Sequence, residues 1–261
     1  MNQQDTSNAA AILWQHWQQT TRFDELPAHC RPASRAEAYA IQAELAKQSA
    51  QSIVGWKIAA TSKAGQQHIQ VNGPIAGCLL SARALEGGAR ISLAGNNMKV
   101  AEAEFAFRMG TDLPRRASAY SVSEVLAAVA TLHPAIEVPD SRYADFTRVG
   151  APQLIADAAC ACWFVLGPAT RADWRAIDLS RHGVIGYRNG AVAGEGSGAN
   201  VLGDPRAALA WLANELSTFG DGLRAGDYVM TGTCLTPVPV VVGDSFKADF
   251  GAIGMLEAVF V

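Results

Sequence analysis

Two glutamates separated by one residue, Glu102 and Glu104, lie in the stretch KVAEAEFAF, whose other residues are mostly small or apolar. Successive side chains of a β-strand point to opposite faces, so an extended segment would place both carboxylates on the same face. Two neighbouring negative charges raise one another's pKa, and keeping both ionised is costly unless a cation lies between them. The alternative is that this face is solvated and that both glutamates are ordinary surface residues.

A third glutamate, Glu137, occurs in the apolar run AIEV that ends at Pro139. A carboxylate in a second strand-like context suggests a site that it shares with Glu102 and Glu104. Three carboxylates form the hard oxygen ligand set that suits Mg²⁺ or Mn²⁺, which usually keep waters and accept further oxygens from a substrate. The three glutamates are therefore interpreted either as ligands of a divalent metal ion, which is the more specific hypothesis, or as ordinary surface residues.

A lysine in an apolar setting, Lys57, lies between Trp56 and Ile58 in the stretch VGWKIAATSKAG. Desolvation disfavours the charged form of a lysine, which suits acid and base catalysis near neutral pH. The alternative is a lysine whose stem is buried while its ammonium group reaches water.

Two groups of small hydroxyl residues could contact an anionic ligand. Thr61 and Ser62 follow the lysine segment and could bind a carboxylate or shape a turn. In the stretch TGT, Gly232 permits close backbone approach to a ligand, and the neighbouring Thr231 and Thr233 could help to hold an anion.

Composition limits the possible partners. The 261 residues are 49% hydrophobic with a formal net charge of −3, which indicates a soluble globular protein. The chain has no Lys/Arg-rich run, so the sequence does not indicate binding to nucleic acid or to an acidic membrane. The first twenty residues lack the features of a secretory signal, so a cytoplasmic location is the default expectation.

The cysteines and histidines show no pattern typical of a metal site. The five cysteines have neither a disulfide framework nor zinc-ligand spacing, and we interpret them as buried or inert thiols. His68 and His133 have no partner at metal-ligand spacing, and both are expected to be structural or surface residues.

The sequence pattern changes near residue 52, from helical periodicity to short strand-like runs. Residues 1–51 are expected to be a helical N-terminal segment, with helices from about Asn8 to Thr20 and after Ser34, which has capping-box spacing to Glu37. Residues 52–261 are rich in short Val/Ile runs punctuated by Gly and Pro, which predicts one β-rich catalytic domain. The clearest helix in it begins with Pro205 and is stopped by Gly220.

Five stretches in this order, GWKIAATS, EAEFAF, AIEVPDSRY, GANVLGDPRAALAWLANEL and VMTGTCLTPVPVVVGDSFKADFG, resemble the 2-oxopent-4-enoate hydratase and 4-oxalocrotonate decarboxylase group of the fumarylacetoacetate hydrolase superfamily. The resemblance runs from about Ala38 to the C-terminus. It implies an α+β fold of the mixed β-roll type and 2-oxo or 2-hydroxydienoate acids as substrates.

The family's metal ligands fall on Glu102, Glu104 and Glu137, with Mg²⁺ or Mn²⁺ as the ion, and its active-site lysine falls on Lys57. The resemblance implies a lyase of aromatic-compound catabolism that adds water to a 2-hydroxydienoate to give a 4-hydroxy-2-oxo acid. The alternatives are a decarboxylase of a 4-oxalocrotonate-type diacid and a catalytically reduced subunit that binds a 2-oxo acid. The resemblance also implies homo-oligomers and leaves open a complex with a related lyase.

Three positions depart from the family pattern. Hydratases carry a P-D-F-G stretch whose aspartate is a proposed acid or base, whereas this chain has GPIAG with Ile75 at that position. Decarboxylases carry P-I-Y-G, so this position favours them. The family's ADNAS is ADAAC here, so Ala158 and Cys160 replace an amide and a hydroxyl. His68 is a candidate replacement for the missing aspartate.

Overall fold

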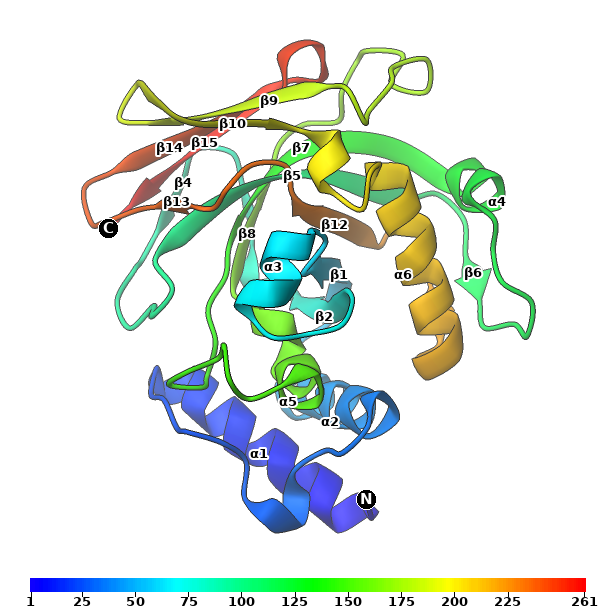
Figure 1. The fold of residues 1–261 in the computed structure, drawn as a ribbon, viewed down its shortest axis with the longest axis vertical. Coiled ribbons are helices and arrows are strands. Elements are labelled where there is room, and N and C mark those ends of the chain that lie inside the picture. The colour runs from blue at the N-terminus through cyan, green and yellow to red at the C-terminus, as the bar shows by residue number, and fades with distance from the viewer.

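The computed structural model describes every residue from Met1 to Val261, and a long curled sheet forms its centre (Figure 1). In spatial order this sheet contains β2 (Ile75–Leu80), β1 (Ile53–Ala59), β12 (Tyr228–Thr233), β5 (Val100–Met109), β7 (Val129–Val138), β8 (Trp163–Leu166) and β3 (Ala84–Glu86), and β13 (Val238–Pro239) also pairs with β5. A second sheet contains β10 (Ala191–Ser197), β9 (Gly183–Arg188), β14 (Ser245–Asp249), β15 (Met255–Phe260) and β4 (Ala89–Ile91). The short strands β6 (Leu113–Pro114) and β11 (Gly222–Leu223) pair with each other. The predicted α+β class with a mixed β-roll is confirmed.

Three of the six α-helices gather at one end of the molecule. The α-helices are α1 (Gln3–Gln19), α2 (Arg35–Gln48), α3 (Lys63–His68), α4 (Val122–Ala127), α5 (Ala151–Ala156) and α6 (Pro205–Phe219). In Figure 1, α1, α2 and α5 lie together below the sheets, and α6 runs along one side. None of the helices is both long enough and apolar enough to span a lipid bilayer.

Local sequence signals define the helix ends closely. Asp204 caps α6 by accepting a hydrogen bond from the N–H of Arg206, Pro205 follows at the first helical position, and the helix stops at Gly220, as predicted. Ser34 caps α2, but the carboxylate of Glu37 accepts from the N–H of Ala33, so the predicted capping box is only half formed. The first helix begins five residues earlier than predicted, at Gln3.

Strand pairing brings the chemical groups together. The antiparallel pairing of β5 with β7 places Glu102 opposite Glu137. Strand β12 runs antiparallel to β5 and parallel to β1, where Lys57 lies beside Met230. Four neighbouring strands of one sheet therefore carry the lysine, the TGT stretch and the three glutamates.

Candidate functional site

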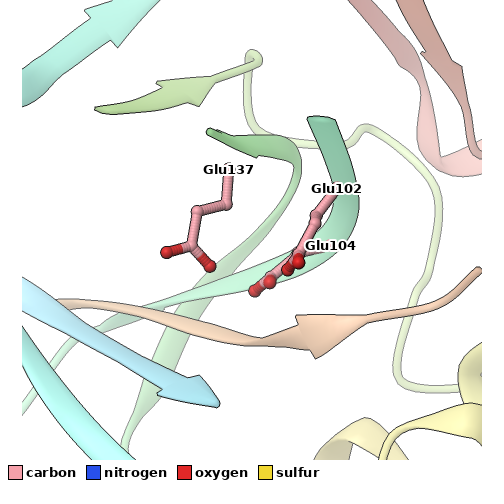
Figure 2. A group of neighbouring side chains, drawn as sticks. All are labelled: Glu102, Glu104 and Glu137. Carbon is pink, nitrogen blue, oxygen red and sulfur yellow. The ribbon is translucent and has the colours of Figure 1, made fainter. Parts of the chain in front are cut away.

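The three glutamates form one cluster on the concave sheet (Figure 2). One carboxylate oxygen from each of Glu102, Glu104 and Glu137 lies within 4.8 Å of the other two. Glu102 and Glu104 share a face of β5 because they are two residues apart on one strand, and Glu137 reaches the same face from β7. The predicted shared site is thus formed by two adjacent strands.

Burial decides between the two interpretations of the glutamates. Glu104 is 0% exposed and Glu137 is 1% exposed, so the solvated-face alternative is wrong for these two residues, while Glu102 is half-buried. Glu104 Oε2 accepts a hydrogen bond of 2.8 Å from the N–H of Gly232. Glu104 Oε1 and both oxygens of Glu137 have no hydrogen-bond donor. Buried carboxylate oxygens without donors are costly, so this cluster is incomplete without a positively charged ligand.

Lys57 is buried beside this cluster at 3% exposed, so the alternative of an ammonium group in water is wrong. Its Nζ donates a hydrogen bond of 3.0 Å to the carbonyl of Ala159. The same atom lies 3.0 Å from Glu137 Oε1 and forms an ion pair with it. The amine is thereby held at one edge of the carboxylate cluster.

Burial and the charges of the cluster together raise the pKa of Lys57, Glu102 and Glu104. Burial by itself lowers the pKa of Lys57, but the carboxylates of Glu137, Glu102 and Glu104 reverse this effect and the net shift is upward. The expectation of a lysine whose charged form is disfavoured is therefore wrong for the protein without a metal ion. Burial, followed by the charge of Glu137, raises the pKa of Glu102 to about 7. Burial and the other two carboxylates hold the pKa of Glu104 well above its usual range.

The donor set fits a hard divalent cation. Three carboxylates carry three negative charges when ionised, and Lys57 supplies one positive charge, which leaves two negative charges in a buried position. A cation of charge +2 bound by oxygen ligands would balance them. Glu104 Oε1 and Glu137 Oε2 have no donor and no ion-pair partner, and they are available to act as its ligands.

The predicted hydroxyl contacts separate into two groups. Thr61 is 6% exposed and packs against Gly232, where an added Cβ would lie 2.3 Å from Thr61 Oγ1. Gly232 has φ +105°, a conformation that other residues rarely adopt, and its N–H contacts Glu104. By contrast, the hydroxyls of Ser62, Thr231 and Thr233 bind backbone groups of the chain itself. Of this set, the Gly232 backbone contacts the carboxylate cluster through Glu104, and Thr61 packs against Gly232.

The position of the family aspartate lies beside the lysine. Strand β2 pairs Gly77 with Lys57 and Ile75 with Ala59, so Ile75 points to the same face as Lys57, one pleat further along. Ile75 is 0% exposed. The candidate substitute, His68, is exposed at the end of α3 with its ring against Phe146. The neighbourhood of the lysine is therefore apolar on this side.

A loop that sequence reasoning missed supplies the acceptor for Lys57. Ala158, Ala159 and Cys160 all have positive φ, of 49°, 49° and 62°. Asp157, at the start of this loop, forms a buried ion pair with Arg142, whose guanidinium also donates to the carbonyls of Asp157 and Ala161. Left-handed backbone is uncommon in such residues and is maintained only where the surroundings fix it. This network holds the Ala159 carbonyl in place.

The remaining cysteines and His133 are structural, as predicted. Cys30, Cys78, Cys160 and Cys234 are buried, Cys162 is half-buried, and all five are free thiols. Burial raises the pKa of Cys160 and of Cys78 to about 12, which disfavours their reactive thiolates. His133 binds the carbonyl of Gly167 at 2.9 Å and lies outside the cluster.

The raised pKa of Glu102 predicts a pH dependence of stability in the metal-free protein. A carboxyl whose pKa is higher in the folded state stabilises the fold below its unfolded value of about 4.5, and this contribution is lost as pH rises through about 7. We therefore expect the free energy of unfolding in EDTA to fall between pH 5 and pH 8 more steeply for the natural protein than for Glu102→Gln. Urea denaturation at several pH values measures this free energy of unfolding. The difference between the two proteins isolates Glu102 from His133, whose pKa burial lowers and which acts in the opposite sense. Parallel pH profiles would contradict the prediction.

The chain is similar to known proteins in both sequence and structure. The family described as fumarylacetoacetate (FAA) hydrolase C-terminal matches residues 45–261. The chain is 34% identical to a 2-hydroxyhexa-2,4-dienoate hydratase of Comamonas testosteroni over 83% of this chain and 81% of that protein. It is 33% identical to a 4-oxalocrotonate decarboxylase of Pseudomonas putida over 87% of this chain and 85% of that protein. The crystal structure of a 4-oxalocrotonate decarboxylase from Pseudomonas putida G7, complexed with magnesium and adipate, matches with a TM-score of 0.90 and 28% identity and covers 100% of this chain and 99% of that chain.

Proposed function

The chain belongs to the fumarylacetoacetate hydrolase family, and from this premise we propose that it is a metal-dependent lyase that hydrates a 2-hydroxydienoate to a 4-hydroxy-2-oxo acid in aromatic-compound catabolism. The observation that carries the proposal is the buried cluster of three carboxylates with Lys57 Nζ 3.0 Å from Glu137. Relatives at 32% to 34% identity named as hydratases support the reaction class. We assign the reaction to the carbon–oxygen lyases.

We propose Glu102, Glu104 and Glu137 as ligands of Mg²⁺, with Mn²⁺ as the alternative ion. A bound divalent cation supplies Lewis-acid stabilisation of the negative charge that develops on the 2-oxo oxygen of the substrate. The burial of Glu104 and Glu137 limits the access of water to this position and strengthens the interaction. Related decarboxylase structures contain magnesium or calcium, which supports a divalent ion.

We propose Lys57 as the residue that transfers protons to and from substrate carbon when the dienol and enone forms interconvert. The carbonyl of Ala159 orients its ammonium group, and Glu137 holds the proton-bearing nitrogen at the edge of the cluster. Neutralisation of the carboxylates by a divalent cation would remove the influence that now raises the pKa of Lys57, so the amine would release its proton more readily.

We propose donors for the substrate carboxylate among the hydroxyl and amide groups near Glu104. We propose that Thr61 contacts the substrate carboxylate, because it packs against Gly232, whose N–H donates to Glu104, and that Gly232 permits close approach of the substrate. Ser62, Thr231 and Thr233 then shape the loops that carry these contacts.

Decarboxylation of a 4-oxalocrotonate-type acid is the second candidate, and one observation favours it. Hydration requires a group that activates water, whereas loss of CO₂ requires only the electron sink and a proton. Ile75, on the face of Lys57 and fully buried, provides no such group. The related decarboxylase of known structure matches the whole chain, which supports this alternative.

We further propose that the protein is a homo-oligomer and that residues 52–261 form its β-rich catalytic domain, with residues 1–51 as a helical N-terminal segment. All proposed site residues lie after residue 52. Exposed large apolar residues support self-association, and five of them lie on or beside the five-stranded sheet: Val192, Val241, Val242, Met255 and Val261.

The decisive experiment follows two substrates with the purified protein, once with Mg²⁺ and once with EDTA. We expect magnesium-dependent loss of the ultraviolet absorbance of 2-hydroxypenta-2,4-dienoate, with a 4-hydroxy-2-oxo acid identified by mass. Magnesium-dependent release of CO₂ from the diacid formed by 2-hydroxymuconate would instead assign the decarboxylase. No reaction with either substrate would contradict both assignments.

A further inference from the structure

A polar cavity of about 280 Å³ lies between the end of α1, the loops that follow β4 and β7, and the start of β8. Its wall contains Trp17, Gln18, Thr20, Arg22, Arg83, Ser92, Ala94, Asn96, Asp140, Arg142, Cys162 and Trp163. Lys57 and the three clustered glutamates are not part of this wall. The cavity is therefore separate from the proposed metal centre.

Three arginines and one aspartate give this wall a positive charge. Arg22 forms an ion pair with Asp140, and Arg142 forms one with Asp157, which lies behind the wall. Arg83 has neither an ion-pair partner nor a side-chain hydrogen bond. One guanidinium at the cavity thus keeps its full charge and all its donors free.

Aromatic packing fixes the direction of this free guanidinium. The Cζ atom of Arg83 lies 4.2 Å from the ring centroid of Trp163 and 5.9 Å from that of Trp17. Stacking on indole leaves the planar edge of a guanidinium available for a bidentate contact. A side chain that is already ordered loses less conformational entropy when a ligand binds.

The cavity has more donors than acceptors. The indole N–H of Trp17 and the Nε–H of Arg22 are both buried without an acceptor. Arg142 also stacks on the Trp17 ring, with its Cζ atom 4.0 Å from the centroid, so two guanidinium groups approach one indole. An acceptor with negative charge is the chemical group that this wall lacks.

We propose that this cavity binds the carboxylate of a small organic acid, held by the Arg83 guanidinium between Trp17 and Trp163. A single free positive charge matches a monoanion, and Asp140 in the same wall disfavours a dianion such as phosphate. The apolar indole rings suit the hydrocarbon part of such an acid better than they suit a fully hydrated inorganic ion.

Calorimetric titration of the full-length protein with benzoate tests this proposal. The titration is done in EDTA, so that no metal ion can bind the carboxylate at the three glutamates. We expect saturable binding that weakens by at least about tenfold in Arg83→Met, because the bidentate charged contact is lost. Arg83→Lys keeps the charge without the planar fork and should weaken binding to a lesser degree. The matched control is Arg90→Met, an exposed arginine of β4 outside the cavity, which should bind benzoate as the natural protein does.

Two results would overturn the proposal. One is equal benzoate affinity in Arg83→Met and the natural protein, or no saturation up to about 20 mM. The other is tighter binding of inorganic phosphate than of benzoate, since the charge of the wall predicts the reverse order. Circular dichroism spectra of all variants, together with Arg83→Lys as a second substitution, separate loss of binding from loss of folding.

Discussion

Replacement of Glu104 by glutamine is expected to reduce metal-dependent turnover by at least about 10³-fold, because it removes one charged ligand from the centre of the cluster. The amide can still accept the Gly232 hydrogen bond, so the backbone contact is retained. The substitution also removes a carboxylate from a buried group that carries excess negative charge. In EDTA, the variant should therefore be at least as stable as the natural protein, and Mg²⁺ should no longer raise its melting temperature.

Activity and thermal denaturation, each with Mg²⁺ and with EDTA, measure this prediction. Glu257→Gln is the matched control, because Glu257 is an exposed glutamate of β15. It should keep full activity and the full stabilisation by Mg²⁺. A Glu104→Gln variant that kept either property would show that Glu104 is not a metal ligand.

Replacement of Lys57 by methionine is the second large effect, with an expected loss of about 10² to 10⁴ in turnover, the range typical for removal of a general acid or base. Methionine preserves much of the buried length of the side chain but cannot exchange a proton. The three carboxylates lose their only neighbouring positive charge, so the metal-free variant should be less stable at pH 8. For the same reason, Mg²⁺ should stabilise the variant at least as strongly as it stabilises the natural protein.

Exchange of substrate protons with deuterated solvent, followed by NMR, gives the direct readout for Lys57. We expect this exchange to fall in parallel with turnover. The control is Lys47→Met, an exposed lysine on α2. Normal exchange in Lys57→Met with normal binding of Mg²⁺ would remove the lysine from the mechanism.

The sequence was most informative where the chemistry lies within one strand. The period of two residues between Glu102 and Glu104 was sufficient to predict that they share a face, and β5 places them so. The apolar neighbours of Lys57 left its burial open, because the same pattern also fits a lysine whose ammonium group reaches water. Helix α6 could be delimited from Asp204, Pro205 and Gly220, because capping is a local interaction.

The sequence was less informative where long-range contacts determine the outcome. The pairing of Glu102 with Glu137 depends on the register between β5 and β7, which no local pattern specifies. The net upward shift of the Lys57 pKa depends on carboxylates from two other strands. The spacing of residue types was enough to predict the candidate metal ligands. It could not predict how their charges and that of Lys57 shift one another's pKa.

The loop at Ala158–Cys160 could not be predicted from its residues. Three consecutive residues adopt left-handed backbone without a glycine or asparagine to indicate it. The conformation depends on tertiary contacts, namely the Arg142–Asp157 ion pair on one side and the close packing of Gly77 on the other, where an added Cβ would lie 1.8 Å from the carbonyl of Ala158. These contacts come from distant parts of the chain.

The position of β12 between β1 and β5 has a consequence for how the protein is made. Lys57 and Glu104 lie on strands that are joined in the sheet only through β12, and β12 ends at Thr233. At about 5–20 residues per second, a ribosome completes Thr233 roughly 6 to 25 s after Met109, the last residue of β5. During that interval β1 and β5 each have an unpaired edge. Unpaired strand edges favour aggregation, and chaperones limit it. The newly synthesised chain therefore acquires its lysine and carboxylates as one site only near the end of translation.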